Sequence, residues 1–153
     1  MFATPIHHAA IIVSDLEKSL HFYRDILEWK VLMDDALPSP DIAEVMGVPG
    51  LTGRTVILQK DHRIVDGMIE LIEISKPKPE SSQKGKGFNT TGLRLLSFRV
   101  DDIEQVYNAL LDKGVTFISP PRQLNLKEYS IKSCFFLDPD NVRIEIIEFL
   151  HTK

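Results

Sequence analysis

Three side chains in this 153-residue sequence could together bind a metal ion: His8 and one glutamate from each of two pairs, Glu70 or Glu73 and Glu145 or Glu148. Each lies in an apolar segment with the composition of a β-strand. A carboxylate that points into a concave apolar surface needs a partner, because burying an unpaired charge costs several kcal/mol. A divalent cation would satisfy two glutamates and a histidine at once. Imidazole suits zinc, nickel, cobalt or iron, and carboxylates extend the choice to manganese.

These residues belong to a pattern that occurs twice along the chain. Residues 13–17 (Val-Ser-Asp-Leu-Glu) correspond to 100–104 (Val-Asp-Asp-Ile-Glu), and 68–73 (Met-Ile-Glu-Leu-Ile-Glu) correspond to 143–148 (Arg-Ile-Glu-Ile-Ile-Glu). The separation falls from 87 to 75 residues, because the first copy contains an additional segment over residues 38–53. Two matches in the same order indicate a duplication rather than two unrelated amphipathic segments.

The elements expected around these residues follow from hydrophobic periodicity and from turn residues. The first copy predicts strands over 6–13, 29–33, 54–59 and 68–75, with helices over 16–27 and 41–46. The second copy predicts strands over 93–100, 115–118, 131–137 and 142–149, a helix over 103–113 and a loop over 120–129. We therefore predict an α+β fold, with a single domain (1–153) of two tandem β-α-β-β-β modules forming a curved sheet around a cavity. Module one spans 6–75, the linker 76–92 and module two 93–149.

Strand alternation predicts which side chains face the cavity. The bulky apolar set of the first strand in each copy should pack on the helix, which leaves His8, Ser97 and Arg99 on the other face. Arg99 could receive a carboxylate or a phosphate there, or it could be an edge arginine in solvent. In the last strand of each copy, only one of the two glutamates can face the cavity, because the second lies three residues further on.

Composition excludes several classes of protein. The net charge of −4 comes without a basic stripe, so we expect no nucleic-acid partner. No apolar run approaches the roughly 20 residues that span a bilayer, so we expect no membrane association. Cys134 is the only cysteine, which precludes an intramolecular disulfide and suits a cytoplasmic location. It lies in an apolar run and should be buried rather than reactive.

Taken together, these stretches resemble the vicinal oxygen chelate superfamily. That superfamily includes glyoxalase I, methylmalonyl-CoA epimerase, extradiol dioxygenases, fosfomycin-resistance enzymes and bleomycin-binding proteins. The segments that carry the resemblance are residues 8–16, 22–23, 69–71, 98–103, 136–140 and 144–145. The resemblance covers most of the chain and implies the fold more strongly than the reaction.

The resemblance implies His8, Glu70 and Glu145 as metal ligands. The fourth position of the family falls on Leu95, which cannot coordinate a metal and would instead line the substrate site with Ser97 and Arg99. This departure argues against an extradiol dioxygenase, which needs two histidines and one glutamate.

The family then implies a lactoylglutathione lyase-like or epimerase-like metalloenzyme. Such a lyase or isomerase would act on a small carbonyl compound through a metal-stabilised enediolate or enolate, with Glu70 or Glu145 as the catalytic group that moves the proton. The alternative is a metal-free protein of the same fold that binds a small molecule, for resistance or sequestration. Family members also commonly form homodimers, and we expect the same here.

Overall fold

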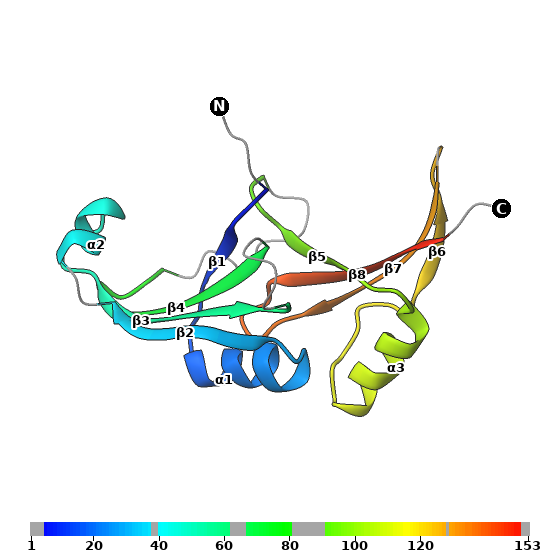
Figure 1. Ribbon diagram of the computed structural model, residues 1–153, viewed down its shortest axis with the longest axis horizontal. Helices are drawn as coiled ribbons and strands as arrows, with labels where there is room; N and C mark the ends of the chain where they lie inside the picture. The colour runs from blue at the N-terminus through cyan, green and yellow to red at the C-terminus, as the bar shows by residue number, and fades with distance from the viewer. Residues whose placement is uncertain (1–4, 38–39, 62–66, 81–90, 128, 151–153) are drawn as a thin grey trace. The chain divides into compact units, whose positions relative to one another are not determined.

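A computed structural model describes residues 5–37, 40–61, 67–80, 91–127 and 129–150 of the chain. The chain divides into two compact units, Met1–Ser81 and Ser82–Lys153 (Figure 1). The central part of the expected linker, residues 81–90, lies outside the described residues. Each unit contains its own four-stranded sheet.

The first unit follows the predicted β-α-β-β-β order, with one short additional helix. Its elements are β1 (His8–Ile12), α1 (Leu16–Leu20), the π-helical segment η1 (His21–Ile26), β2 (Lys30–Leu37), α2 (Pro40–Val45), β3 (Thr52–Gln59) and β4 (Met68–Lys76). The strand order is β1-β4-β3-β2, in which β1 and β4 are parallel and the other pairs are antiparallel. The helix expected over 16–27 is therefore present, but its second half is wound more widely. The Leu27 amide donates to the Phe22 carbonyl five residues earlier, at 2.9 Å.

The second unit repeats this topology. Its elements are β5 (Leu95–Arg99), α3 (Ile103–Asp112), β6 (Arg122–Asn125), β7 (Ser130–Leu137) and β8 (Arg143–Leu150). The strand order is β5-β8-β7-β6, again with the first and last strands parallel. Gly114 follows α3 with a φ of +82°, the left-handed conformation expected where a helix ends. The predicted fold of two β-α-β-β-β modules is confirmed.

One predicted strand was wrong. Residues 115–118 form no strand, and their only sheet-like contact among the described residues is a single bridge between Phe117 and Phe136. The edge strand is β6, which lies in the segment predicted to be a loop. All four residues of β6 are exposed, and its sequence, Arg-Gln-Leu-Asn, does not show the alternation of apolar and polar residues that predicts a strand. Antiparallel pairing with β7 makes it a strand, and a pattern based on burial does not reveal that pairing.

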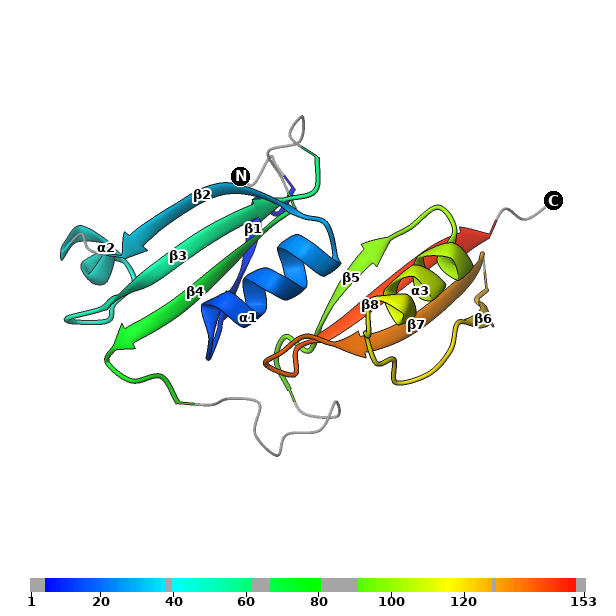
Figure 2. The same cartoon turned by 90° about the horizontal axis from the view of Figure 1, so that it is seen from below.

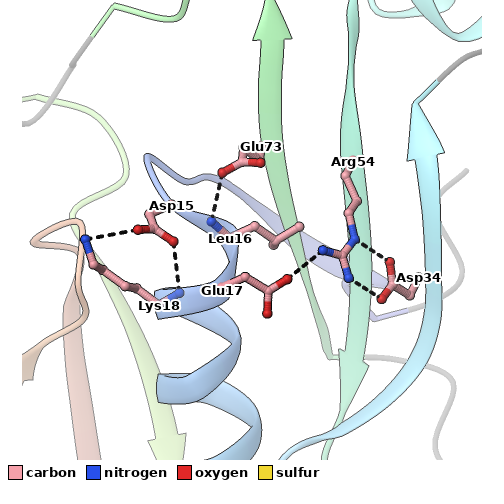
Figure 3. A network of polar contacts seen from close by, with 7 residues as sticks. All are labelled: Asp15, Leu16, Glu17, Lys18, Asp34, Arg54 and Glu73. Carbon is pink, nitrogen blue, oxygen red and sulfur yellow. Dashed lines mark hydrogen bonds and ion pairs between the residues drawn. The ribbon is translucent and has the colours of Figure 1, made fainter.

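The first helix begins at two carboxylates, one from its own N-cap and one from a strand. Asp15 Oδ1 accepts a hydrogen bond from the Lys18 amide at 3.1 Å. Glu73 Oε1 of β4 accepts one from the Leu16 amide at 3.0 Å (Figure 3). The first amides of a helix have no partner within the helix, so both bonds satisfy groups that would otherwise be unpaired. The two carboxylates also lie at the positive end of the helix dipole.

Helix α3 of the second unit begins in the same way. Asp102 Oδ1 accepts from the Gln105 amide at 3.0 Å, and Glu148 Oε2 of β8 accepts from the Ile103 amide at 2.9 Å. In both units, therefore, the later glutamate of the last strand lies on the side of the sheet that carries the helix. Strand alternation then leaves the earlier glutamate on the other side, as predicted.

Apolar side chains fill the layer between each helix and its sheet, where α1 contacts β4 and α3 contacts β8 (Figure 2). In the first unit the fully buried side chains include Val13, Leu16, Leu20, Tyr23 and Leu71. In the second unit they include Ile103, Cys134, Phe136 and Ile144. Burial of each large apolar side chain contributes about 1.5–3 kcal/mol. None of the helices in the described part of the chain is long and apolar enough to cross a membrane.

Removing the strand carboxylate should destabilise the unit to which it belongs. We expect Glu73→Ala and Glu148→Ala each to lower the free energy of unfolding by about 1–2 kcal/mol, because a helix amide loses its acceptor. Urea unfolding followed by circular dichroism measures this loss. The control is Glu80→Ala, since Glu80 is exposed beyond the end of β4. It should change the stability by less than about 0.5 kcal/mol. If both strand variants were as stable as the control, the role given to these bonds would be wrong.

Arg54 links the helix to the edge strand on the same side of the first sheet. Its guanidinium donates to both carboxylate oxygens of Asp34, at 2.8 and 2.7 Å, and to Glu17 Oε1 at 2.7 Å (Figure 3). This guanidinium lowers the pKa of Asp34 below its ordinary value of 3.8, and the two carboxylates raise the pKa of Arg54. The three side chains are substantially exposed, so solvent screening keeps their contribution to stability small.

The Asp34–Arg54 pair predicts a pH-dependent term in stability. The pKa of Asp34 is lower in the folded than in the unfolded chain, so its contribution is present above about pH 4 and is lost as the pH falls through the folded pKa. Asp34→Asn should therefore reduce the free energy of unfolding at pH 6 by less than about 1 kcal/mol. That difference should be smaller at about pH 3, because it decreases as the pH falls through the lowered pKa of Asp34 in the folded chain. Urea unfolding at both pH values measures it. In an Arg54→Gln background the Asp34→Asn change should lose this pH dependence, and its persistence there would contradict the assignment.

Candidate functional site

His8, Glu70 and Thr55 form a cluster on the side of the first sheet away from its helix. Strand pairing puts Ala10 beside Glu70, with His8 two residues earlier on β1. His8 Nε2 lies 3.2 Å from Glu70 Oε2, and Thr55 Oγ1 donates to Glu70 Oε1 at 2.7 Å. The side chains of His8 and Glu70 are 38% and 17% exposed. The pair is therefore partly shielded by the protein but still open to a ligand.

Glu145 occupies the corresponding position in the second sheet. It lies beside Ser97 of β5, and Ser133 Oγ donates to Glu145 Oε1 at 2.6 Å. Leu95, two residues before Ser97, stands where the first unit has His8. The described residues of the second unit contain no histidine. This carboxylate therefore has the hydroxyl partner of its counterpart, but an apolar side chain in place of the imidazole.

Arg99 lies at the end of β5 on the same side of the sheet as Glu145. Its pairing partner, Ile147, is two residues beyond that glutamate. The guanidinium carbon is 5.3 Å from the centre of the Phe149 ring, within the range of a cation–π contact. The Tyr129 ring lies 5.6 Å from that of Phe149, measured between ring centres. The second unit thus presents an exposed cation beside the Phe149 ring, which in turn contacts Tyr129, and a guanidinium is well suited to bind a carboxylate or phosphate.

The structure groups the predicted site residues within each unit. One side of the first sheet carries His8 and Glu70, and one side of the second sheet carries Leu95, Ser97, Arg99 and Glu145. Across the part of the chain that the structure describes, no three His, Cys, Asp or Glu side chains come together in a metal-binding group. The complete ligand set of His8, Glu70 and Glu145 therefore remains a prediction.

The His8–Glu70 pair fits a divalent cation in donor chemistry and in spacing. Two ligand atoms that each lie about 2.0–2.2 Å from one ion, at octahedral to tetrahedral angles, are roughly 2.8–3.6 Å apart. The observed separation of 3.2 Å between Nε2 and Oε2 falls in this range. The same separation also suits a direct hydrogen bond, so it identifies a compatible pair of ligands rather than a metal.

Sequence reasoning missed Thr55 and Ser133. Neither is a metal ligand of the usual kind, and each lies inside a strand where a small polar residue has no periodic signal. The internal repeat does relate the two residues. Strands β3 and β7 align with a constant separation of 78 residues, so Thr55 corresponds to Ser133. A strand-by-strand alignment of the two copies would have identified them.

Cys134 lies on the opposite side of the second sheet and is fully buried, as predicted. Burial is the main cause that raises the pKa of its thiol to about 12, and nearby glutamates add to it. Only the thiolate is an effective nucleophile, so Cys134 is a poor nucleophile at neutral pH.

The chain matches the profile of a known family. The profile of the Glyoxalase/Bleomycin resistance protein/Dioxygenase superfamily covers residues 5–146. The chain therefore belongs to this superfamily. The resemblance inferred from the sequence is confirmed, and the two β-α-β-β-β modules are those of the superfamily fold.

Individual relatives are distant. The uncharacterized protein YwkD from Bacillus subtilis (strain 168) is 31% identical over 150 residues, which cover 97% of this chain and 99% of YwkD. A probable lactoylglutathione lyase from Synechocystis sp. is 27% identical over 141 residues, which cover 92% of each protein. The crystal structure of a glyoxalase family protein from Bacillus cereus matches with a TM-score of 0.81 and 14% identity, covering 99% of this chain and 97% of that protein. At this identity the structural match establishes the fold alone.

Cys134 should be unreactive in the native protein. We expect no reaction with Ellman's reagent at pH 7.5 over an hour without denaturant, because the thiol is buried and protonated. One equivalent should react within minutes in 8 M urea. Rapid modification of the folded protein would show that this part of the second unit opens readily.

Proposed function

We propose that this chain is a glyoxalase-like lyase or isomerase that acts on a small carbonyl compound with the help of a divalent metal ion. Membership of the superfamily supports this reading, as does similarity to a probable lactoylglutathione lyase. The proposed metal ligands are His8, Glu70 and Glu145. Zinc, nickel, cobalt, manganese and iron all accept this set of donors.

The observation that carries the proposal is the repeated carboxylate–hydroxyl pair. Each unit holds one glutamate on the side of the sheet away from its helix, at 2.7 Å from Thr55 in the first unit and at 2.6 Å from Ser133 in the second. In the first unit an imidazole nitrogen lies 3.2 Å from the second carboxylate oxygen. A fold that places ionised groups on this face of both sheets, and keeps them partly shielded, is equipped to bind a cation.

The chemistry would divide between the metal and the side chains of this chain. When bound, the metal would polarise the substrate oxygens and stabilise the negative charge that develops beside a carbonyl group. Glu70 or Glu145 would be the catalytic residue that accepts a proton from the adjacent carbon and returns it to a neighbouring position. Arg99 would bind an anionic group of the substrate, and Leu95 and Ser97 would line its contact surface.

A second candidate is a metal-free protein that binds a small molecule. Leu95 favours it, because a leucine at the position that corresponds to His8 removes one potential ligand. The superfamily description itself includes a bleomycin resistance protein, so binding without catalysis is within its range. The same leucine makes an extradiol dioxygenase the less favoured enzyme. For either function we propose a homodimer in the cytoplasm.

Metal analysis separates the two candidates. Protein purified without chelator and then titrated with Zn²⁺, Ni²⁺ or Mn²⁺ should bind about one ion per chain if the lyase or isomerase proposal is correct. His8→Ala and Glu70→Gln should each lower the bound metal to less than about a tenth of the wild-type amount. They should also abolish any formation of lactoylglutathione or other isomerase activity that is found.

The matched control is His21→Ala. His21 is exposed on the helix, where it pairs with Asp25, so its removal should leave metal binding unchanged. Binding of all three ions by His8→Ala as tightly as by wild type would exclude His8 as a ligand. A wild-type protein that binds none of the three ions would favour the small-molecule binding protein.

A further inference from the structure

Two buried hydroxyl groups donate hydrogen bonds to the glutamates that we propose as metal ligands. Thr55 Oγ1 donates to Glu70 Oε1 at 2.7 Å, and Ser133 Oγ donates to Glu145 Oε1 at 2.6 Å. Thr55 and Ser133 are only 5% and 4% exposed. Bonds of this length are typical of a hydroxyl that donates to an ionised carboxylate.

The two bonds arise at the same place in each sheet. Thr55 of β3 pairs with the residue two positions beyond Glu70, and Ser133 of β7 pairs with the residue two positions beyond Glu145. Each hydroxyl is therefore the diagonal neighbour of its glutamate on one face of the sheet, within reach of its side chain. The two strands otherwise keep only the general character of their residues here, with Thr-Val-Ile-Leu in the first copy and Ser-Cys-Phe-Phe in the second. At this position both copies keep a hydroxyl residue.

These bonds add little to the architecture of the sheet. The strands that they connect are already joined by backbone hydrogen bonds, β3 to β4 and β7 to β8. The carboxylates that attach the helices are different ones, Glu73 and Glu148, on the other side. What the two hydroxyls contribute is a fixed position for Oε1 of Glu70 and Oε1 of Glu145.

We infer that Thr55 and Ser133 are positioning residues, each of which occupies one oxygen of its glutamate and so presents the other oxygen to the ligand. In the first unit the presented oxygen is Oε2, which lies 3.2 Å from His8 Nε2. A neutral donor satisfies one oxygen and leaves the negative charge in place for a cation. This inference rests on the proposed function, in that it takes the two glutamates to be metal ligands.

The test removes each hydroxyl and measures affinity for Zn²⁺ by isothermal titration calorimetry. Thr55→Val and Ser133→Ala should each weaken binding by about 10–100-fold, the usual effect of losing a group that orients a ligand. Thr55→Ser and Ser133→Thr should restore affinity to within about threefold of wild type, because they restore the donor. An unchanged affinity in both hydroxyl-free variants would overturn the inference.

Matched controls come from the same two strands. Thr52→Val removes an exposed hydroxyl from β3, and Ser130→Ala removes one from β7 that donates to Asn125 at 2.9 Å. Both should bind Zn²⁺ as wild type does. Weakening as large as that of Thr55→Val and Ser133→Ala would show a general effect of strand substitution and would overturn the inference.

Crystal structures of metal-free wild type and Thr55→Val separate failure of this inference from failure of the proposed function. If the wild type binds none of Zn²⁺, Ni²⁺ and Mn²⁺, the proposed function fails, but the orientation of the Glu70 carboxylate can still be compared. Positioning by Thr55 predicts that Oε1 leaves its place in Thr55→Val and that the carboxylate rotates. A carboxylate in the same orientation in both structures would overturn the inference, whether or not the wild type binds metal.

Discussion

In each unit a strand glutamate accepts a hydrogen bond from the first amide of the helix, on the side of the sheet that the helix covers. Glu73 and Glu148 are the acceptors, at 3.0 and 2.9 Å. Side chains alternate along a strand, so a residue three positions away must lie on the opposite side. The glutamates at those positions, Glu70 and Glu145, are thereby directed away from the helix. One strand thus supplies a carboxylate that organises the fold and another that remains available for chemistry.

The two kinds of carboxylate differ in the donors that they meet. The carboxylates on the helix side accept from backbone amides at a helix N-terminus, where the dipole also favours negative charge. Those on the other side accept from hydroxyl groups, which are neutral. The nearest arginine network of the first unit, around Arg54, lies on the helix side and pairs with Asp34 and Glu17. Within that unit the Arg54 guanidinium therefore pairs with exposed carboxylates on the helix side. On the other side, Glu70 contacts His8 and Thr55.

The sequence was most informative where one physical rule operates at a time. Hydrophobic periodicity, turn residues and the internal repeat predicted both modules, and strand alternation predicted that the two glutamates of each last strand lie on opposite sides. Prediction failed where strand pairing decides the outcome. The residues of β6 are exposed and carry no apolar pattern, so only the neighbouring strand makes them a strand. Thr55 and Ser133 were missed for a related reason, since a hydroxyl acquires its role from the residue diagonally across the sheet.

The two units also differ at one row of the sheet in a way that affects what each can bind. In the first unit this row pairs His8 with Met68, and in the second it pairs Leu95 with Arg143. In both units this row contains one basic and one apolar residue. The basic residue lies on the first strand of the first unit, as His8, and on the last strand of the second unit, as Arg143. The basic group therefore changes from an imidazole to a guanidinium. A neutral imidazole can donate a lone pair to a cation, whereas a guanidinium is always charged and has no such lone pair. The first unit is therefore chemically suited to ligate a metal. In the second unit this row holds a leucine and a guanidinium, neither of which can ligate a metal. Divergence at a single row is enough to give two copies of one backbone different binding chemistry.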